Sequence, residues 1–389
     1  MNDFPITRVR RRLLRGFAGA GAIAAGGPAA AQSSSESGSQ SRASSDARAR
    51  FEPVARDRPL RFPRDFGAHP GFRTEWWYVT CWLRAGTLDI GAQITFFRAR
   101  TAHDERNPSR FAPTQLLLAH AALAVDGESR LRHDQRAARA GFGLARANTA
   151  DTDLQIGSDW TLRRGPGDRY SARIVGNTFV LELGLSPRAA PVAQGDDGYS
   201  RKGPRPEQAS HYYSRPQLDV IGTVSLQSLP GAGAQRTLPV DGRAWLDHEW
   251  SSELLDPQAQ GWDWVGLNFD DGTSLMAFRI RSRDASGSPG ALWSHARWIG
   301  AGQRTEPVRF EPVRQWRSPR SGAEWPVEMR LVVGERRLDL RPMFDDQELD
   351  TRASTGTIYW EGAVRVFERD RLIGRGYLEL TGYAGALRL

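Results

Sequence analysis

The sequence predicts an all-β protein that folds as two tandem antiparallel β-barrels. Short runs of β-branched and aromatic residues recur from about residue 51 onward, which is the pattern of strands. Glycine (40 residues) and proline (23 residues) separate these runs at turns, and long amphipathic helical patterns are not evident. About 340 residues follow the N-terminal segment, more than one hydrophobic core usually holds, so two domains are expected.

Each half of the chain has an aromatic strand, a short glycine turn and a second strand. Trp76–Leu83 and Leu88–Phe97 form the first such pair, and Trp262–Phe269 and Thr273–Ile280 form the second. This parallel favours two related barrels, which bury their edges and can enclose an apolar ligand; two β-sandwiches would give the same pattern. The other predicted strands are Leu116–Val125, Tyr170–Ile174, Phe179–Leu185, Leu218–Leu226, Ala291–Ile299, Val327–Val333, Arg337–Leu340, Gly356–Phe367 and Leu372–Leu380.

The N-terminus has the order of a twin-arginine export signal. Consecutive arginines at positions 10–12 precede an Ala/Gly-rich run at 17–27, and Ala29–Ala31 offers small residues for signal peptidase. The apolar run is too short and too weakly hydrophobic to span a bilayer permanently. We therefore expect a periplasmic or secreted protein, cleaved before Gln32. The predicted organisation is a signal peptide at 1–31, a disordered Ser-rich linker at 32–54, a first barrel at 55–240 and a second at 241–389.

Charge and cysteine content exclude two classes of protein. The formal net charge is +8, but residues 1–31 contain five arginines and one aspartate, so their removal leaves +4. The body has no block of basic residues, and we expect no nucleic-acid partner. Cys81 is the single cysteine, so no intrachain disulfide can form. It lies in an alternating apolar strand, which favours a small buried hydrophobe over a thiol nucleophile.

The first cluster of chemical interest is His69–Tyr78. Alternation along a strand would place Glu75 and Trp77 on one face, away from Tyr78. A Glu75 that faces inward beside a ring would have a raised pKa and could act as a general acid or base. Alternatively, Glu75 pairs with an arginine and holds one end of a barrel shut. His69 precedes a proline and is expected in a loop at a barrel mouth.

The second cluster, Ala244–Trp250, places three ionisable residues in a row between tryptophans. On an extended segment Asp247 would share a face with Glu249, while His248 would face the other way. An Asp–His arrangement suits proton transfer, because the carboxylate orients the ring and fixes its tautomer. A structural hydrogen-bond cluster at the domain junction is the alternative. If one site holds both clusters, it is an apolar pocket with proton-transferring groups in its wall.

Lys202 is the only lysine, beside 52 arginines. A lysine in such a composition indicates a need for a compact or titratable amine, although chance would also explain one. A titratable aromatic patch follows at His211–Ser214.

The seven histidines include no HxH or HExxH pair, so we expect no metal and no cofactor. A metal site would need spatial convergence of distant histidines. No Gly-x-Ser-x-Gly, P-loop or dinucleotide motif is present, which argues against standard serine hydrolases and nucleotide enzymes. The histidines that would have to converge are His69, His120, His211 and His248.

Taken together, these motifs resemble the carotenoid 1,2-hydratase (hydroxyneurosporene synthase)/AttH-like family. The resemblance covers about residues 55–389 and is closest to the exported AttH-like branch, often labelled predicted secreted hydrolases. It implies two lipocalin-like barrels in tandem and allows for a peripheral membrane contact. The matching segments are His69–Pro70, Glu75–Tyr78, Gly198–Gly203, Ala209–Ser214 and Ala244–Ser251.

For the hydratases of this family, the resemblance implies acid-catalysed addition of water to a terminal isoprenoid double bond without a cofactor. An aspartate would protonate the alkene, and aromatic rings would stabilise the tertiary carbocation. His248 and Trp250 occupy the His/Trp-bearing motif of the family. The candidates for the proton donor are Asp247, Asp263 and Asp270.

The leading hypothesis is an exported protein that binds an apolar isoprenoid or lipid-like ligand and acts as a cofactor-free hydro-lyase. One alternative is a non-enzymatic lipocalin-like carrier, and another is a metal-dependent secreted hydrolase. The oligomeric state is not determined by the sequence. The expected acid–base groups are Asp247, His248 and Glu75, and the expected ligand-binding residues are Trp77, Trp250, Tyr213, His211, Lys202 and Trp264.

Overall fold

A computed structural model describes residues 51–103, 107–227, 236–283, 289–300 and 302–386. The expected signal peptide and residues 32–50 of the expected linker lie outside these ranges. The described chain is almost entirely β, with two antiparallel sheets and two short 3-10 segments, η1 (Arg64–Phe66) and η2 (Pro166–Asp168). Among the described residues, no helix has the length and apolar character needed to cross a membrane.

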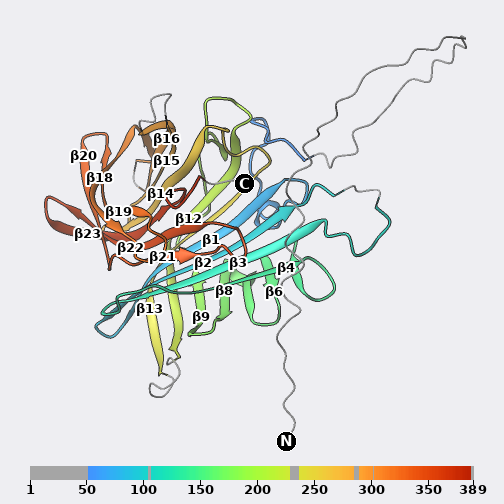
Figure 1. Ribbon diagram of the computed structural model, residues 1–389, viewed down its shortest axis with the longest axis horizontal. Helices are drawn as coiled ribbons and strands as arrows, with labels where there is room; N and C mark the ends of the chain where they lie inside the picture. The colour runs from blue at the N-terminus through green and yellow to red at the C-terminus, as the bar shows by residue number, and fades with distance from the viewer. Residues whose placement is uncertain (1–50, 104–106, 228–235, 284–288, 301, 387–389) are drawn as a thin grey trace, which may run out of the picture. The chain divides into compact units, whose positions relative to one another are not determined.

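The first sheet contains 13 strands and curls into a barrel (Figure 1). β1 (Thr74–Ala85) lies between β2 (Leu88–Arg100) and β13 (Arg236–Ser251), and β12 (Ala209–Leu226) follows on the other side of β13. The remaining strands are β3 (Gln115–Val125), β4 (Arg132–Arg139), β5 (Ala145–Ala147), β6 (Asp153–Ile156), β7 (Trp160–Gly165), β8 (Arg169–Val175), β9 (Phe179–Ser186), β10 (Val192–Ala193) and β11 (Tyr199–Arg201).

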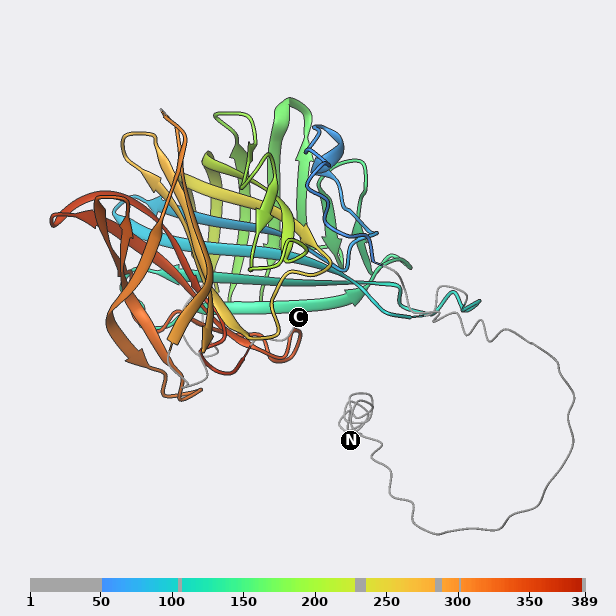
Figure 2. The same cartoon turned by 90° about the horizontal axis from the view of Figure 1, so that it is seen from above.

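The second sheet contains 10 strands and forms a half-barrel (Figure 2). Its centre is β14 (Ala259–Phe269), β23 (Arg371–Leu380) and β22 (Ile358–Glu368), in that order. The others are β15 (Ser274–Arg283), β16 (Pro289–Ile299), β17 (Arg304–Glu306), β18 (Val308–Arg317), β19 (Glu324–Val333), β20 (Arg336–Pro342) and β21 (Glu348–Asp350).

Strand alternation divides the buried side chains among three clusters. Trp77, Val79 and Cys81 of β1 point into the core of the first barrel, whereas Tyr78 and Trp82 pack between the two sheets. A separate core fills the second sheet. The expected division of the β1 side chains between two faces is therefore confirmed. Burial raises the pKa of the Cys81 thiol to about 12, so this residue is an inert buried hydrophobe.

The all-β, lipocalin-like tandem fold agrees with the sequence prediction, with two differences in detail. The second sheet is a half-barrel, and an expected domain boundary at residue 240 falls inside β13, which pairs along its length with strands of the first sheet. By sheet membership, the chain changes sheets between residues 252 and 258. Polar or short strands such as β4 and β5 were not predicted, because they lack the aromatic and β-branched runs on which the prediction relied.

Close approach of the two sheets requires glycine at one position of β2. A Cβ atom on Gly91 would lie 2.5 Å from Cβ of Ala363 and 2.8 Å from the hydroxyl oxygen of Tyr377, both in the second sheet. We expect Gly91→Ala to lower the free energy of unfolding by about 1–3 kcal/mol in urea denaturation, because the sheets must move apart. Gly184→Ala is the control, since its nearest non-neighbour atom would be 3.7 Å away. Equal losses in both variants would contradict this packing.

Candidate functional site

The central strands of the first sheet carry both sequence clusters in register. Across β1, β13 and β12, Trp77 lies opposite His248, and His248 lies opposite Tyr213. One residue further along, the row is Tyr78, Asp247 and Ser214. Because neighbouring rows face opposite sides of a sheet, the first row points into the barrel and the second points toward the second sheet. The two faces therefore form two distinct environments.

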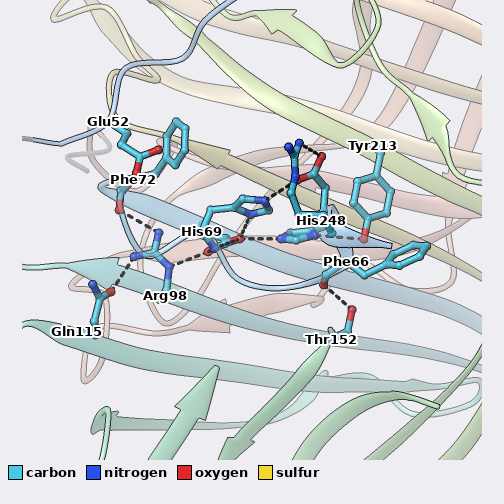
Figure 3. A network of polar contacts seen from close by, with 12 residues as sticks. Glu52, Phe66, His69, Phe72, Arg98, Gln115, Thr152, Tyr213 and His248 are labelled. Carbon is cyan, nitrogen blue, oxygen red and sulfur yellow. Dashed lines mark hydrogen bonds and ion pairs between the residues drawn. The ribbon is translucent and has the colours of Figure 1, made fainter. Parts of the chain in front are cut away.

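Glu75 is the centre of the barrel-side environment, where it contacts the side chains of His69, Arg98 and His248, which Figure 3 labels. Its Oε1 accepts hydrogen bonds from Nδ1 of His69 (2.7 Å) and Nε2 of His248 (2.8 Å), and its Oε2 accepts from Nε of Arg98 (2.7 Å). The backbone N–H of His69 also donates to this carboxylate, at 2.9 Å from Oε2. The carboxylate is fully buried, and four donor groups compensate its charge.

The pKa of Glu75 follows from these contacts. Burial alone would raise the pKa, but His69, His248 and Arg98 outweigh burial and hold it well below its ordinary value. Glu75 is therefore ionised, and the expectation of a raised pKa at this residue is wrong. Arg98, on the neighbouring strand β2, is the arginine partner that the alternative interpretation required.

The two histidines that flank Glu75 have opposite protonation preferences. Burial would lower the pKa of His69, but Glu75 and Asp65 raise it above its ordinary value. Burial lowers the pKa of His248 to about 4. His248 is therefore neutral: Nε2–H donates to Glu75, and Nδ1 accepts from the Tyr213 hydroxyl at 3.1 Å.

Aromatic rings complete the barrel-side network. His69 stacks on Trp250 with ring centroids 3.6 Å apart, and His248 stacks on Trp77 at 4.3 Å. His211 also contacts Trp250, at 5.6 Å, and neither of its ring nitrogens has a hydrogen-bond partner among the described residues. Burial lowers the pKa of His211 to about 4. These rings hold the histidine side chains in place, and donors occupy both oxygens of Glu75. The network is therefore rigid.

A metal site of the kind considered from the sequence does not suit this geometry. His69, Glu75 and His248 place ligating atoms within 4.8 Å of one another, and within the described ranges they form the one group that does so. However, the Arg98 guanidinium contacts the same carboxylate and would repel a divalent ion. His120 does not join the other histidines; its Nε2 lies 2.9 Å from the Ser354 hydroxyl, at the junction of the sheets.

A cavity of about 80 Å³ lies on the opposite face of the same strands, between the two sheets. Its walls are largely aromatic and aliphatic, but four carboxyl groups and one amine also reach it. It is lined by Thr74, Trp76, Tyr78, Thr95, Phe97, Lys202, Asp247, Glu249, Leu254, Trp262, Trp264, Phe278, Ile280, Tyr359, Glu361 and Glu379.

Asp247 is the carboxyl group best placed for proton exchange in this cavity. It accepts hydrogen bonds from the Tyr212 hydroxyl (2.7 Å), the Ser214 hydroxyl (2.6 Å) and the Trp245 indole N–H (2.7 Å). Burial raises its pKa to about 7, although the three hydrogen bonds oppose the shift. Both protonation states are thus accessible near neutral pH, which is the property that was expected of Glu75 from the sequence.

Lys202 is fixed in the cavity wall by an ion pair. Its Nζ lies 2.9 Å from a Glu249 carboxylate oxygen, and it lies over the ring of Phe278 at 4.1 Å. The indole N–H of Trp264 donates to the Tyr212 hydroxyl at 3.2 Å, so Trp264 is held edge-on to the polar wall. Both ligand-binding candidates therefore line the cavity that contains Asp247.

The predicted site residues are thus divided by the sheet. Of the three aspartates considered as proton donor, Asp247 alone lines the cavity. Asp263 is buried in ion pairs with Arg279 and Arg281, and Asp270 lies in an exposed turn. The barrel-side residues are Glu75, His248, Trp77, Trp250, Tyr213 and His211, and the cavity residues are Asp247, Lys202 and Trp264.

Two acidic residues of the cavity were missed in the sequence analysis. Burial raises the pKa of Glu361 well above its ordinary value and the pKa of Glu379 to about 8. Each is the single charged residue in an otherwise apolar part of its strand, Trp360–Val364 of β22 and Tyr377–Leu380 of β23. An isolated acid within an apolar segment was the available signal, because carboxyl groups in an apolar environment need a partner or a proton.

Comparison with known proteins identifies the family. The sequence profile described as AttH-like matches residues 53–383, most of the chain. The chain belongs to the AttH-like family. A crystal structure from Nitrosomonas europaea, of a protein described as an AttH, is 45% identical to this AttH-like protein. The match covers 86% of this chain and 100% of that one, with a TM-score of 0.77.

A second solved structure shares the fold of this AttH-like protein at much lower identity. Kievitone hydratase from Nectria haematococca is 14% identical, with a TM-score of 0.62 over 86% of this chain and 98% of that chain. Among curated proteins, no match was found.

The barrel-side network of this AttH-like protein predicts a large effect of Glu75→Gln on stability. The substitution leaves the buried Arg98 without its counter-charge and leaves His69 with Asp65 alone, so the free energy of unfolding should fall by about 3–5 kcal/mol in urea denaturation. Glu182→Gln, which breaks the exposed ion pair with Arg173, is the matched control and should cost about 0–1 kcal/mol. A loss below 1 kcal/mol for Glu75→Gln would contradict the account.

The same network predicts how the stability loss caused by Glu75→Gln depends on pH. Because the folded pKa of Glu75 is depressed, its stabilising contribution is present above the ordinary pKa of 4.5 and is lost as the pH falls through the folded pKa. Because the folded pKa of His69 is raised, its contribution is present below 6.5 and is lost as the pH rises through the folded pKa. We therefore expect the free energy of unfolding, measured in urea between pH 3 and 9, to differ most between wild type and Glu75→Gln at about pH 5–6.

Proposed function

We propose that this protein is exported and binds an apolar isoprenoid or lipid-like ligand in the cavity between the sheets, where it acts as a cofactor-free hydro-lyase. The observation that carries the proposal is Asp247, a buried carboxyl group with a pKa raised to about 7 by burial in an aromatic wall. The export component rests on the order of residues 1–31.

Addition of water to a carbon–carbon double bond needs an acid and a base at the same pH. A neutral carboxyl group gives its proton to one alkene carbon; the π electron pair forms the new C–H bond and leaves a cation on the other carbon. Water attacks the cation, forms the C–O bond and loses a proton to a carboxylate. A group whose pKa is about 7 can take part in either proton transfer.

The walls of the cavity suit the intermediate of this reaction. Trp264 and Tyr78 pack edge to face with ring centroids 5.3 Å apart, and Phe97 lines the same space. Aromatic faces stabilise a cation by their quadrupole, and do so more strongly where water is excluded. The paired charges of Lys202 and Glu249 leave the wall without a net positive charge that would oppose a carbocation.

The volume of the cavity limits what it can enclose. One water needs roughly 10–15 Å³ on the same measure, so about 80 Å³ corresponds to roughly five to eight water-sized groups. This is about the size of a terminal isoprenyl unit together with one water. The remainder of a longer ligand would lie outside the enclosed space.

The shared fold with kievitone hydratase supports the architecture only, because the identity is 14%. The same apolar walls would also serve a carrier without activity, in which the neutral Asp247 would be a consequence of burial. The difference between an enzyme and a carrier therefore rests on whether Asp247 is needed for turnover.

Asp247→Asn tests this requirement. With squalene in detergent micelles and isotope-labelled water, we expect the rate of label incorporation to fall about 10²–10⁴-fold, because an amide cannot transfer the proton. Squalene affinity, followed by quenching of tryptophan fluorescence, should change less than threefold, since the shape of the side chain is kept. Asp270→Asn, in an exposed turn, is the control and should retain full activity.

The outcomes distinguish the two functions. Squalene binding without label incorporation in the wild-type protein would favour the carrier. Label incorporation that survives Asp247→Asn would show that the proposed site is wrong.

A further inference from the structure

Two glutamates on neighbouring strands of the second sheet face the cavity together. Glu361 of β22 lies directly opposite Glu379 of β23 in the antiparallel register, so both side chains project from the same face. Both line the cavity. Residues opposite each other in such a ladder have Cβ atoms roughly 4.5–5.5 Å apart, and two like charges at this separation destabilise the pair.

The charges around the cavity do not allow all four carboxyl groups to ionise. Lys202 is the one cationic side chain among the lining residues, and it pairs with Glu249. Within the described part of the chain, no arginine or lysine forms an ion pair with Asp247, Glu361 or Glu379. Three carboxyl groups, of which Asp247 and Glu361 are buried and Glu379 is half-buried, thus share an apolar space without a counter-ion, and groups in this position keep protons.

Hydrogen-bond donors decide which of the three ionises first. Asp247 accepts from three side chains, which stabilise its charged form. Glu361 accepts from the Tyr78 hydroxyl at 2.6 Å, and the Trp262 side chain, which lines the same cavity, favours the ionised form of Glu379. Because the two glutamates have fewer hydrogen-bond donors than Asp247, they lose their protons after Asp247 does.

The other charged or titratable groups near the pair do not reverse this order. Burial raises the pKa of each nearby tyrosine above its ordinary value, so these hydroxyls are neutral. The negative charges of Asp247, Glu249 and Asp263 each disfavour the ionised form of Glu379. The tyrosines are Tyr78 on β1, Tyr212 on β12, Tyr359 on β22 and Tyr377 on β23.

We propose that Glu361 and Glu379 form the proton-donating pair of the site, and that ionised Asp247 is the base that takes the proton from water. This assignment rests on the proposed hydro-lyase function and deepens it. In the forward step, a neutral glutamate of the pair gives its proton to the alkene and becomes a carboxylate. Water adds to the cation and loses its proton to Asp247, and exchange with solvent restores the starting protonation.

The proposal fixes the shape of the pH profile. Turnover should rise with pH as Asp247 ionises near 7, and it should fall at higher pH as the pair loses its first proton. A mechanism with Asp247 as the donor would instead lose activity as the pH rises through 7.

The test combines an infrared measurement, which needs no substrate, with the squalene assay. The variant carries Glu361→Gln and Glu379→Gln together, which keeps neutral side chains of similar size, and each single substitution is measured as well. Glu368→Gln is the control, because this residue is on β22 but pairs with Arg336 outside the cavity. The carbonyl stretch of neutral carboxyl groups is recorded from pH 5 to 10 in wild type, variants and Asp247→Asn.

We expect the neutral-carboxyl band of the wild type to persist above pH 7, to survive Asp247→Asn and to be lost in the double variant. Incorporation of labelled water into squalene should fall at least 100-fold in the double variant and be unchanged in the control. A band unaffected by the double substitution would overturn the proton assignment. Full activity of the double variant would overturn the donor role, while the hydro-lyase proposal would stand.

Failure of the underlying function gives a different result. If the wild-type protein adds no water to squalene and the band still depends on the two glutamates, the hydro-lyase proposal fails and the donor role fails with it. The infrared band distinguishes the two failures, because an incorrect proton assignment would leave the band unchanged in the double variant.

Discussion

The buried carboxylate of Glu75 is the interaction on which the end of the first barrel depends. It joins strand β1 to Arg98 on β2, to His248 on β13 and to the segment that carries His69. These partners come from separate parts of the chain, and each has a buried nitrogen that would lose its acceptor without the carboxylate. Loss of one member of such a buried network costs more than its presence contributes, because desolvation is not recovered. The network therefore fixes the register of β1 against its neighbours.

This register has a consequence on the other face of the same strands. When His248 is held by Glu75 inside the barrel, Asp247 must point toward the second sheet, because successive side chains alternate. The barrel side compensates every charge and is rigid. The cavity side has fewer positive groups than carboxyl groups and must keep protons. One strand thus presents a structural acid–histidine network on one face and exchangeable protons on the other.

The strand pattern, the two-sheet architecture and the alternation within Asp247–Trp250 could be predicted from the sequence, since each depends on local periodicity. The direction of the Glu75 pKa shift could not, because it depends on how the fold places His69, His248 and Arg98 around the carboxylate. The sequence left open whether one site holds both clusters, because the answer depends on strand pairing: His248 meets Glu75 inside the barrel, whereas Asp247 faces the cavity. Glu361 and Glu379 are far from both motifs in sequence, and only the pairing of β22 with β23 brings them together at the cavity.

The central claim is that chemistry belongs to the cavity between the sheets and that the barrel-side network is structural. A crystal structure of the protein with bound farnesol tests this most directly, since an isoprenoid alcohol resembles a hydrated product. We expect the ligand between the sheets, in contact with Asp247 and Glu379, with the hydrogen bond between Glu75 and His248 unchanged. Farnesol inside the first barrel against Trp250 and His248, with that hydrogen bond broken and the cavity empty, would contradict the account.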